Sequence, residues 1–580
     1  MPRFGRRWGS LLVVTTIVLF FIVSHKKVVP NVPTQFTTTT PICAPPPPWQ
    51  PYEPPKNGAF SWRDVPVNYP VESLERIPFL GADPMPRVQY SFPRPSSRSE
   101  AIRKERQAAV KKTFQKAWNS YAAHAWRKDE LAPISGGSKN TFGGWGATLV
   151  DNLDTLLIME MHEEFEHAIE AVMDIDFSPE SATKGIINMF EITIRYLGGL
   201  IAAYDLTECK DQRLLEMAVR LGDMIYTSYD TPNRMPITRW SPRKAASGKK
   251  QFAADNGILA EMSSSSLEFT RLSQLTGDMR WYDASSRIIK QMEDQVSKTK
   301  LEGLWPVGID VAAPNLTPGS TFTFGSMADS AYEYLGKTYQ LLRAASSTSM
   351  GNRYRNLYDM AMEAGIKHLL FRPKVPDNAD ILVATTVKAN SPSSAQRDNS
   401  GEHLACFVGG MYALGGRLTS NEKHVEIGRK LTDGCIWLYK NSPNGIMPEK
   451  FTLFSCPSPT DCEWDRGDKD FYIGVNDKRY LLRPEAIESV FYLYRITGDP
   501  SLQEAAWDMF QAITNYTTTE YANAALKDVM KEDPPKEDSM ESFWMAETLK
   551  YFYLIFSEPE LISLDDFVFN TEAHPFRIPK

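Results

Sequence analysis

Acidic residues inside otherwise apolar segments are the groups in this sequence with the clearest capacity for chemistry. Glu191 lies in the apolar run 186–197, where on a helix it faces Arg195 at a spacing of i to i+4. Asp329 lies where the glycine-containing segment 323–328 gives way to another apolar run. A carboxyl in such surroundings belongs either to a structural ion pair or to a site that tunes its pKa for acid–base work. Each residue taken singly favours the structural interpretation.

Three more acids repeat this pattern further along the chain. Pro484 suits the first position of a helix, which puts Glu485 and Glu488 in its first turn. Glu547 lies in the apolar run 542–549. Helix capping and a favourable charge at a helix N-terminus would explain each of these acids alone. If their helices line one cavity, however, several carboxyls converge there, and two carboxyls flanking a glycosidic bond suffice to hydrolyse it.

Other common catalytic and binding patterns are absent from the sequence. It contains no H-E-x-x-H, G-x-S-x-G or G-x-G-x-x-G motif and no spaced Cys/His cluster. Gly336-Lys337-Thr338 resembles the end of a phosphate-binding loop, but Ala331 stands where the first glycine should be. The net charge of −7 is spread over both signs without a basic stripe, which argues against nucleic-acid binding.

The elements that must position these acids are helical. Beyond Pro95 the apolar runs have a period nearer 3.6 than 2, which predicts an all-α fold. Helical hairpins recur around turns such as 275–278 and 496–499, where glycine ends one helix and aspartate starts the next. Repeated hairpins form either a solenoid or a closed αα barrel, and the irregular spacing with long insertions favours the barrel. An ordinary multi-helix globule is the alternative.

The N-terminal segment predicts membrane attachment. Arg3, Arg6 and Arg7 precede an apolar run that ends without a small-residue cleavage site. We therefore expect a cytosolic tail (1–9), a short signal anchor (10–24), a Pro/Thr-rich stalk (25–95) and a lumenal catalytic domain (96–580). Such a single-pass type II protein would lie in the Golgi or ER membrane. Secretion after cleavage of a signal peptide is the alternative.

The cysteines and two glycosylation sequons fit a lumenal environment. The pairs Cys406 with Cys435 and Cys456 with Cys462 are candidate disulfides, although the sequence alone leaves the pairing open. Cys43 and Cys209 have no assigned role. The sequons that begin at Asn315 and Asn515 are consistent with an exposed lumenal surface.

Six segments together resemble glycoside hydrolase family 47, the class I α-1,2-mannosidases that trim N-glycans. The resemblance runs in order from about Ser99 to the C-terminus, which makes it specific, and its segments are 144–156, 190–200, 328–335, 403–407, 482–489 and 569–576.

The resemblance implies an (αα)7 barrel, an inverting mechanism and one Ca²⁺ at the base of a sugar pocket. It assigns Glu191 as the proton donor acting through water, Glu485 as the general base and Asp329 as a third catalytic acid. Which of Asp329 and Glu485 is the true base stays open. Thr571 matches the direct calcium ligand, offering its backbone carbonyl and hydroxyl oxygens. Seven further residues match the pocket that holds the terminal mannose or the calcium-bound waters: Arg195, His403, Arg483, Glu488, Phe543, Glu547 and Glu572.

The same resemblance implies a disulfide between Cys406 and Cys435, high-mannose N-glycans on glycoproteins as partners and a monomeric state. Relatives that stop after removing one mannose carry an arginine two residues before the Asp329 position, where this chain has Met327. We therefore expect trimming of more than one mannose. Glu402 stands where many members of the family have aspartate. The alternative function is a lectin-like quality-control factor that binds misfolded glycoproteins and has weak or partner-dependent hydrolysis.

Overall fold

The computed structural model describes residues 43, 60–78, 85–343, 349–458, 460–467 and 469–579, with the side chains of 349–352 left out. All elements named below belong to the compact unit Pro45–Lys580. The expected tail and anchor (1–24) and most of the expected stalk lie outside the described residues. Among the helices of the described ranges, none combines the length and the apolar character needed to cross a membrane.

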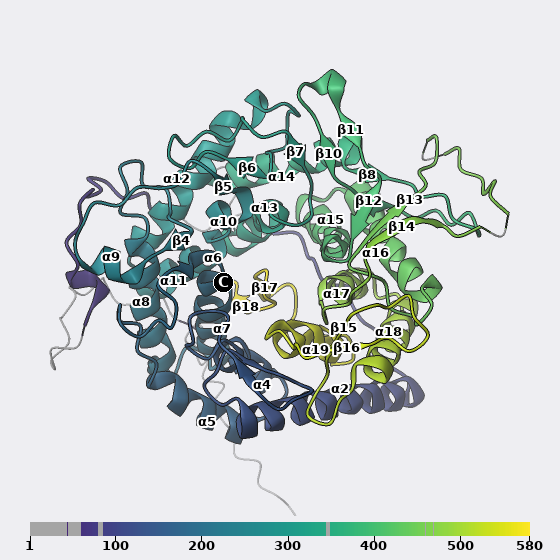
Figure 1. Cartoon of the computed structure of the whole chain (residues 1–580), viewed down its shortest axis with the longest axis horizontal. Coiled ribbons are helices and arrows are strands. Elements are labelled where there is room, and N and C mark those ends of the chain that lie inside the picture. The colour runs from purple at the N-terminus through teal and green to yellow at the C-terminus, as the bar shows by residue number, and fades with distance from the viewer. Residues whose placement is uncertain are drawn as a thin grey trace, which may run out of the picture. The chain divides into compact units, whose positions relative to one another are not determined.

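The chain forms a ring of helical hairpins, as predicted. Figure 1 shows two concentric layers, in which each inner helix except the last is followed in the chain by an outer one. The inner helices are α4 (Leu153–Ile158), α7 (Gly198–Leu206), α11 (Ser266–Thr276), α13 (Asp329–Leu342), α15 (Phe407–Thr419), α17 (Glu485–Thr497) and α19 (Leu549–Ile555). The outer helices are α5 (His162–Met173), α8 (Gln212–Thr227), α12 (Arg280–Gln295), α14 (Ser349–His368), α16 (Glu422–Asn441), α18 (Ser501–Thr517) and α2 (Ser97–His124), the last of which packs against α19.

Burial separates the two layers. Every residue of α13 after Asp329 is buried, whereas α8 and α16 bury only one face. A helix that is buried all round must lie inside its neighbours, and an amphipathic one covers them. The turns between layers also form as predicted, because Gly277 and Gly498 end α11 and α17 in the left-handed conformation.

Short helices and turns lie in the segments between the long helices of the ring. They are α3 (Ala147–Asp151), α6 (Met189–Glu191), α9 (Pro242–Ala246) and α10 (Leu259–Ser263), with 3-10 turns at Trp62–Asp64, Val296–Lys298, Pro392–Ser394 and Leu404–Cys406. Two inner helices begin with π-helical turns, Ile192–Leu197 before α7 and Trp544–Thr548 before α19. π-helical turns are rare and frequently mark functional sites.

The strands are short, antiparallel and confined to the connections. They pair as β1 (Glu130–Leu131) with β2 (Ser138–Lys139), β3 (Ile187–Asn188) with β4 (Arg239–Trp240), β5 (Gly257–Ile258) with β6 (Gly308–Ile309), β8 (Leu370–Phe371) with β9 (Val383–Ala384), and β15 (Ala525–Leu526) with β16 (Lys536–Glu537). Two sheets have three strands, in the orders β11 (Gln396–Arg397), β10 (Val387–Lys388), β7 (Thr321–Phe322) and β12 (Ser400–Glu402), β13 (Lys450–Leu453), β14 (Tyr472–Asp477).

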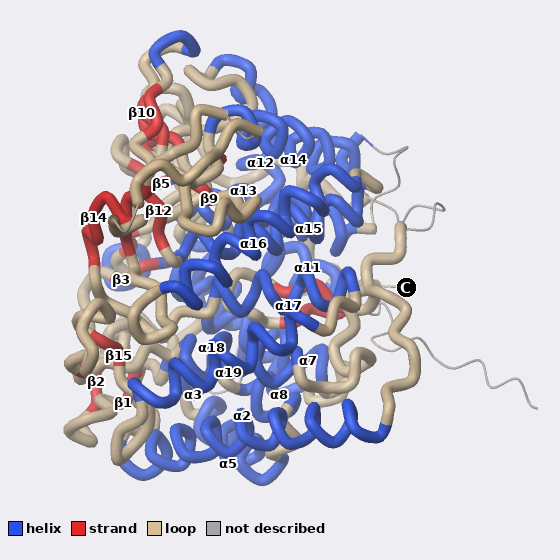
Figure 2. The backbone as a smooth tube through the Cα atoms, turned by 90° about the vertical axis from the view of Figure 1, so that its right-hand side faces the viewer, coloured by secondary structure: helices blue, strands red, loops and turns tan. Residues whose placement is uncertain are grey.

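The last hairpin enters the ring. Its strands β17 (Phe567–Phe569) and β18 (Pro575–Arg577) lie at the centre of the ring in Figure 1. Most of the other labelled strands gather at one end of the barrel, on the left of Figure 2. The chain therefore builds an open mouth from loops and strands at one end and inserts its C-terminal hairpin into the barrel.

Residues that precede the expected domain boundary at residue 95 already pack on the barrel. Trp62 is buried and its ring lies 5.1 Å from that of Trp240. Arg63 contacts Asp223 at 2.6 Å and Asp278 at 3.2 Å. Residues 60–78 and 85–95 thus pack on the barrel, because Trp and Arg side chains from this segment complete its outer layer.

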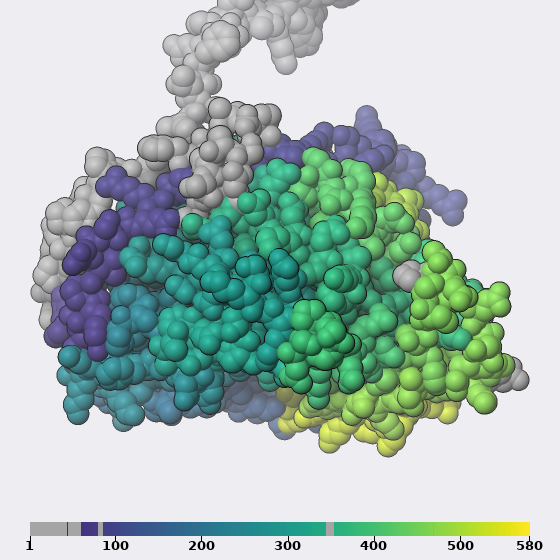
Figure 3. All heavy atoms as spheres, turned by 90° about the horizontal axis from the view of Figure 1, so that it is seen from above, coloured from purple at the N-terminus to yellow at the C-terminus, as the bar shows by residue number. Residues whose placement is uncertain are grey.

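Two predicted disulfides are present. Cys406 bonds to Cys435 and so ties the start of α15 to α16, and Cys456 bonds to Cys462 between β13 and β14. None of the cysteines in the described ranges is free. On the face seen in Figure 3, the teal and green parts of the chain form one continuous surface, and the light-green part that includes β13 and β14 stands out at one side.

Candidate active site

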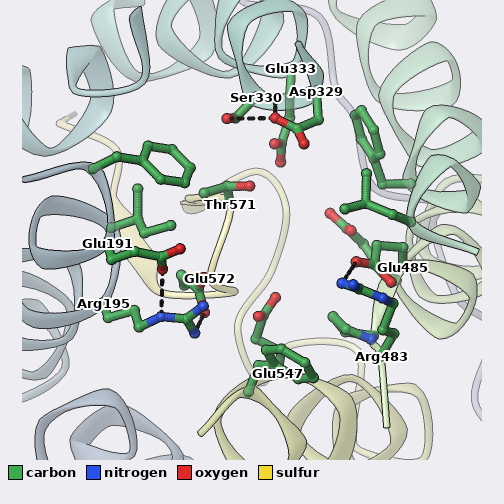
Figure 4. A pocket seen from close by; sticks show the side chains of 17 residues that line it. Glu191, Arg195, Asp329, Ser330, Glu333, Arg483, Glu485, Glu547, Thr571 and Glu572 are labelled. Atoms are coloured by element: carbon green, nitrogen blue, oxygen red, sulfur yellow. Dashed lines mark hydrogen bonds and ion pairs between the residues drawn. The ribbon is translucent and has the colours of Figure 1, made fainter. Parts of the chain in front are cut away.

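The predicted acids converge on one cavity of about 180 Å³ inside the ring (Figure 4). Its walls come mainly from α6, the inner helices α13, α15 and α17, the two π-helical turns and the C-terminal hairpin. Its lining includes all but one of the site residues predicted from the sequence, namely Glu191, Arg195, Asp329, Arg483, Glu485, Glu488, Phe543, Glu547, Thr571 and Glu572. The convergence favours a functional site, because acids that serve only as structural ion pairs need not share one cavity.

One wall of the cavity carries Glu191 and Arg195. Glu191 ends α6, and the π-helical turn that follows places Arg195 Nε 2.9 Å from Glu191 Oε2. Arg195 Nη1 also donates to Glu572 at 2.6 Å and lies 3.7 Å from Asp151. One arginine therefore serves three carboxylates on this wall.

Glu485 forms the opposite wall and is held in its ionised form. His403 Nδ1 lies 3.1 Å from Glu485 Oε2, and Arg483 Nη1 lies 3.5 Å from Glu485 Oε1. Burial raises the pKa of Glu485, but the hydrogen bond from His403 and the charge of Arg483 outweigh it and lower the pKa below its usual value. An ionised carboxylate in a pocket can accept a proton from water.

Backbone strain helps to place this wall. Leu482 has φ 65°, in the left-handed region that a branched, buried residue rarely adopts. Its carbonyl accepts a hydrogen bond of 2.7 Å from Thr548 Oγ1 on the neighbouring π-helical turn. The strained turn directs the following Arg483 and Glu485 into the cavity, in line with the tendency of such strain to occur at functional sites.

Asp329 shows the opposite electrostatic behaviour. It begins α13, where the Ser330 N–H donates to Asp329 Oδ1 at 2.8 Å. Burial raises the pKa of Asp329 to about 7, and the nearby charges of Glu333 and Glu402 add to the rise. Asp329 is therefore neutral below pH ~7 and can donate a proton.

The floor of the cavity has an excess of carboxyl groups. Burial, together with repulsion from neighbouring carboxylates, raises the pKa values of Glu488 and Glu572 to about 8. Burial also raises the pKa of Glu547 well above its usual value, and the charge of Glu572 adds to this effect. Such a group is ionised at neutral pH only if a cation joins it.

Thr571 offers oxygen atoms at this floor. It lies in the turn between β17 and β18, and its backbone N–H donates to Tyr334 Oη at 3.3 Å. Its hydroxyl and carbonyl oxygens make no hydrogen bond within the described ranges, and Figure 4 shows the hydroxyl directed into the cavity. Oxygen ligands beside surplus carboxyls are the donor set that a hard divalent cation prefers.

Comparison with known proteins identifies the family. The family model described as Glycosyl hydrolase family 47 matches residues 113–578. The chain belongs to this family. It is 34% identical over 494 residues to the Arabidopsis thaliana mannosyl-oligosaccharide 1,2-alpha-mannosidase MNS1, covering 83% of this chain and 80% of the relative. It is 33% identical over 538 residues to the Penicillium citrinum mannosyl-oligosaccharide alpha-1,2-mannosidase, covering 89% and 99%.

A solved structure agrees with this assignment. The alpha-1,2-mannosidase from Trichoderma reesei superposes with a TM-score of 0.73 and 30% identity, covering 82% of this chain and 99% of that one. The resemblance that the sequence predicted is therefore confirmed, and so is the (αα)7 barrel of a glycoside hydrolase.

His403 is the one predicted pocket residue of this family 47 chain that does not line the cavity. Its side chain is fully buried behind Glu485, and its Nε2 lies 2.6 Å from Tyr439 Oη. The expected role of His403, in holding the terminal mannose or the calcium-bound waters, stays a prediction. In this structure the imidazole contacts Glu485, which lines the cavity, and does not line the cavity itself.

The sequence reasoning missed the residues that anchor the C-terminal hairpin. His574 lies 3.1 Å from Asp151 and 3.0 Å from Asp154, and Lys550 donates to Asp154 at 2.7 Å. Burial lowers the pKa of His574, but the two aspartates outweigh it and raise the pKa to about 9. These charged groups fix the turn that carries Thr571. Asp151, Asp154 and His574 lie in the family 47 segments, where no role was attached to them, and Lys550 lies outside those segments.

Proposed function

We propose that this family 47 hydrolase is an inverting, calcium-dependent exo-α-1,2-mannosidase that removes terminal α-1,2-linked mannose from high-mannose N-glycans. The observation that carries the proposal is the pairing of an ionised Glu485 with a neutral Asp329 across one sugar-sized cavity. The names of the matched Arabidopsis and Penicillium relatives support the same activity.

In the proposed reaction, Glu485 takes a proton from a water molecule on one face of the terminal sugar. The water oxygen bonds to the anomeric carbon as the glycosidic C–O bond breaks on the other face. Glu191, acting through a second water, delivers a proton to the leaving oxygen, and neutral Asp329 is the third acid at the site. Carboxyls placed on opposite walls, as in Figure 4, suit an inverting displacement because water must enter opposite the leaving group.

Thr571 and the floor carboxyls fit a calcium ion. We infer that the Thr571 hydroxyl and carbonyl oxygens would hold it, while Glu488, Glu547 and Glu572 would bind its water ligands. When bound, the ion would orient sugar hydroxyls and offset the carboxyl charge. Arg195 fixes Glu572, and so it keeps one of these acceptors in place.

Met327 bears on how many mannoses are removed. Its side chain is 54% exposed beside Asp329, and its backbone lies in the left-handed region at φ 75°. An uncharged side chain here makes no ionic contact with one particular glycan branch. We therefore propose that several branches are accepted in turn.

The location and assembly of the chain are also proposals. The human and rat relatives are named as endoplasmic reticulum enzymes, which supports a Golgi or ER membrane location with a lumenal catalytic unit. We propose anchoring by residues 10–24 and a monomeric state. N-terminal sequencing of the mature protein tests the anchor, because a new N-terminus beyond residue 24 would support secretion instead.

The deciding experiment measures mannose released from a free Man9 oligosaccharide by the full chain, with and without a chelator. We expect release of β-mannose as the first anomer by NMR, loss of activity on chelation and recovery with Ca²⁺. Glycan binding without hydrolysis would support the lectin-like alternative. Full activity after complete removal of calcium, checked by metal analysis, would contradict the calcium role.

A further inference from the structure

A hydrogen-bond network that the proposed reaction does not use lies behind the turn that carries Thr571. The turn runs from Asn570 to His574, between β17 and β18. The Asn570 N–H donates to the His574 carbonyl at 3.0 Å, and the Ala573 N–H donates to the Asn570 carbonyl at 3.2 Å. These two bonds close the turn and fix its shape, whereas its orientation in the ring must come from other contacts.

The Asn570 side chain joins the turn to two inner elements of the ring. Its Oδ1 accepts from the backbone N–H groups of Glu572 and His574, each at 2.9 Å. Its Nδ2 donates to the Ile194 carbonyl at 2.9 Å and to Glu268 Oε1 at 2.8 Å. The buried amide therefore makes four hydrogen bonds, as many as an asparagine side chain can make, and two of them lead out of the turn.

Glu268 reaches the same turn by a second path, through Tyr334. Glu268 lies on α11 and is fully buried, and its Oε1 also accepts from Tyr334 Oη at 2.8 Å. Tyr334 lies on α13, and its Oη accepts in turn from the Thr571 N–H at 3.3 Å. One carboxylate oxygen on α11 thus ties both Asn570 and the backbone of Thr571 to the inner helices.

These contacts decide which atoms of the turn are left for a ligand. Glu268, Tyr334 and Asn570 do not line the catalytic cavity, whereas Thr571 and Glu572 do. The N–H groups of Thr571 and Glu572 are therefore engaged behind the cavity wall. The Thr571 hydroxyl is directed into the cavity (Figure 4), and its carbonyl oxygen is not used in closing the turn.

The turn packs against the ring with little free space. A Cβ atom at residue 198, at the start of α7, would lie 2.6 Å from Asn570 Nδ2 and 2.7 Å from the His574 ring, so Gly198 is required for this close approach. Buried polar groups need partners. Removing the carboxyl of Glu268 or the hydroxyl of Tyr334 would leave polar groups without a partner directly behind the turn, and the turn would have to move to satisfy them.

We propose that Glu268 and Tyr334 are positioning residues, which hold the Thr571 turn so that its hydroxyl and carbonyl oxygens face the bound cation. The inference rests on the proposed function in one respect, the calcium ion at the floor of the cavity. Both side chains act on the cation only through the turn. Oxygen ligands that are already held in place bind a cation with a smaller loss of conformational entropy.

Two tyrosines on α13 provide a matched pair of variants. Tyr334→Phe removes the hydroxyl between Glu268 and Thr571. Tyr332→Phe is the control, because Tyr332 is also buried but its hydroxyl accepts from the Trp305 N–H and donates to the Trp305 carbonyl, each at 2.9 Å. The full chain is freed of metal with a chelator and titrated with Ca²⁺ by calorimetry, and its thermal unfolding is recorded with and without Ca²⁺.

We expect Tyr334→Phe to raise the Kd for Ca²⁺ about tenfold, which corresponds to ~1.4 kcal/mol. Tyr332→Phe should leave this Kd within about twofold of the wild type, although both variants lose a buried hydrogen bond and should unfold at a lower temperature when free of metal. Calcium should therefore raise the unfolding temperature less in Tyr334→Phe than in Tyr332→Phe. An equal Kd in the two variants would overturn the proposal.

Variants of Glu268 distinguish hydrogen bonding from charge. Glu268→Gln keeps an acceptor oxygen for Tyr334 and Asn570, so the Kd for Ca²⁺ should stay within about threefold of the wild type. Glu268→Leu removes the acceptor and should raise the Kd at least as much as Tyr334→Phe does. An equal rise for Glu268→Gln and Glu268→Leu would mean that the carboxylate charge attracts the cation, and the positioning role would be wrong.

The binding assay also separates this proposal from the proposed function. A wild-type chain that binds Ca²⁺ with this dependence on Tyr334, yet releases no mannose, would refute the proposed function and support the positioning role. Calcium-dependent release of mannose, together with an unchanged Kd in Tyr334→Phe, would refute the positioning role alone. A wild-type chain that binds no Ca²⁺ would overturn both the positioning role and the proposed calcium dependence.

Discussion

The two walls of the catalytic pocket use the same residue types, glutamate and arginine, with different outcomes. On one wall Arg195 is shared by Glu191, Glu572 and Asp151. On the other, Glu485 lies next to His403 and Arg483, and Arg483 also contacts Glu449 at 2.5 Å. Burial raises the pKa of Glu572 to about 8 in spite of the charge of Arg195, whereas His403 and Arg483 outweigh burial at Glu485 and lower its pKa. Whether the neighbouring cations and hydrogen-bond donors outweigh burial therefore decides which acid is ionised.

The largest expected effect comes from removing the ionised carboxylate. Glu485→Gln keeps the shape of the side chain but cannot accept a proton from water, so kcat for Man9 should fall by about 10²–10⁴-fold. The measurement is mannose release together with a thermal unfolding curve. A kcat within tenfold of the wild type, from a folded protein, would contradict the role of this wall.

Removing each arginine tests how far the burial of its side chain matters on the two walls. Arg195→Met leaves several buried carboxyls without their cation and should lower the free energy of unfolding by about 3–5 kcal/mol. Arg483→Met should cost less, about 1.5–3 kcal/mol, because its side chain is 23% exposed against 7% for Arg195. Urea unfolding in one buffer measures both. Equal losses of unfolding free energy would mean that the deeper burial of Arg195 has no energetic consequence.

The pH profile of activity sharpens the electrostatic contrast. Glu485 must be ionised, so activity is present above its lowered pKa and disappears as the pH falls through it. If the third acid, Asp329, acts in its neutral form, activity falls as the pH rises through its raised pKa of about 7, and an alkaline limb elsewhere would show that its protonation is not required. His403→Leu removes the hydrogen bond that lowers the pKa of Glu485 and should move the acid limb of kcat upward by about one pH unit.

His403→Gln provides the matched control for that shift, because its amide can still donate a hydrogen bond to Glu485. In His403→Gln the acid limb should lie between its wild-type position and its position in His403→Leu. The alkaline limb should be the same in both variants. If His403→Leu moved the alkaline limb alone, the imidazole would act on Asp329 and not on Glu485.

The smallest expected effect concerns the mouth and not the walls. Met327→Arg adds a charge beside Asp329 without touching either glutamate wall. We expect the first mannose to be released at a rate within about tenfold of the wild type, whereas later products of Man9 digestion should accumulate less. Chromatography of the products over time measures this. A wild-type chain that stops at one Man8 isomer would contradict the proposed broad trimming.

Prediction from the sequence worked best where the signal was local. The helical period and the turn glycines at 277 and 498 were enough to predict the helical hairpins of the all-α fold. Apolar neighbours in the sequence were enough to single out four acids, Glu191, Asp329, Glu485 and Glu547. The family resemblance added Thr571, which no local pattern distinguishes. The pocket residue Glu333 and the hairpin anchor His574 were missed, because one looks like an ordinary helical acid and the other depends on partners about 420 positions away.

The sequence by itself determined which segments are helices, where they stop and which of them carry acids, because these depend on neighbours within one or two turns. Only the tertiary structure decided what the acids do. Glu485 and Glu488 lie one turn apart on α17, yet the pKa of the first is lowered and that of the second is raised to about 8. The difference arises because His403 and Arg483 face the first, whereas at the second burial and repulsion from Glu333 and Glu485 outweigh the charge of Lys337.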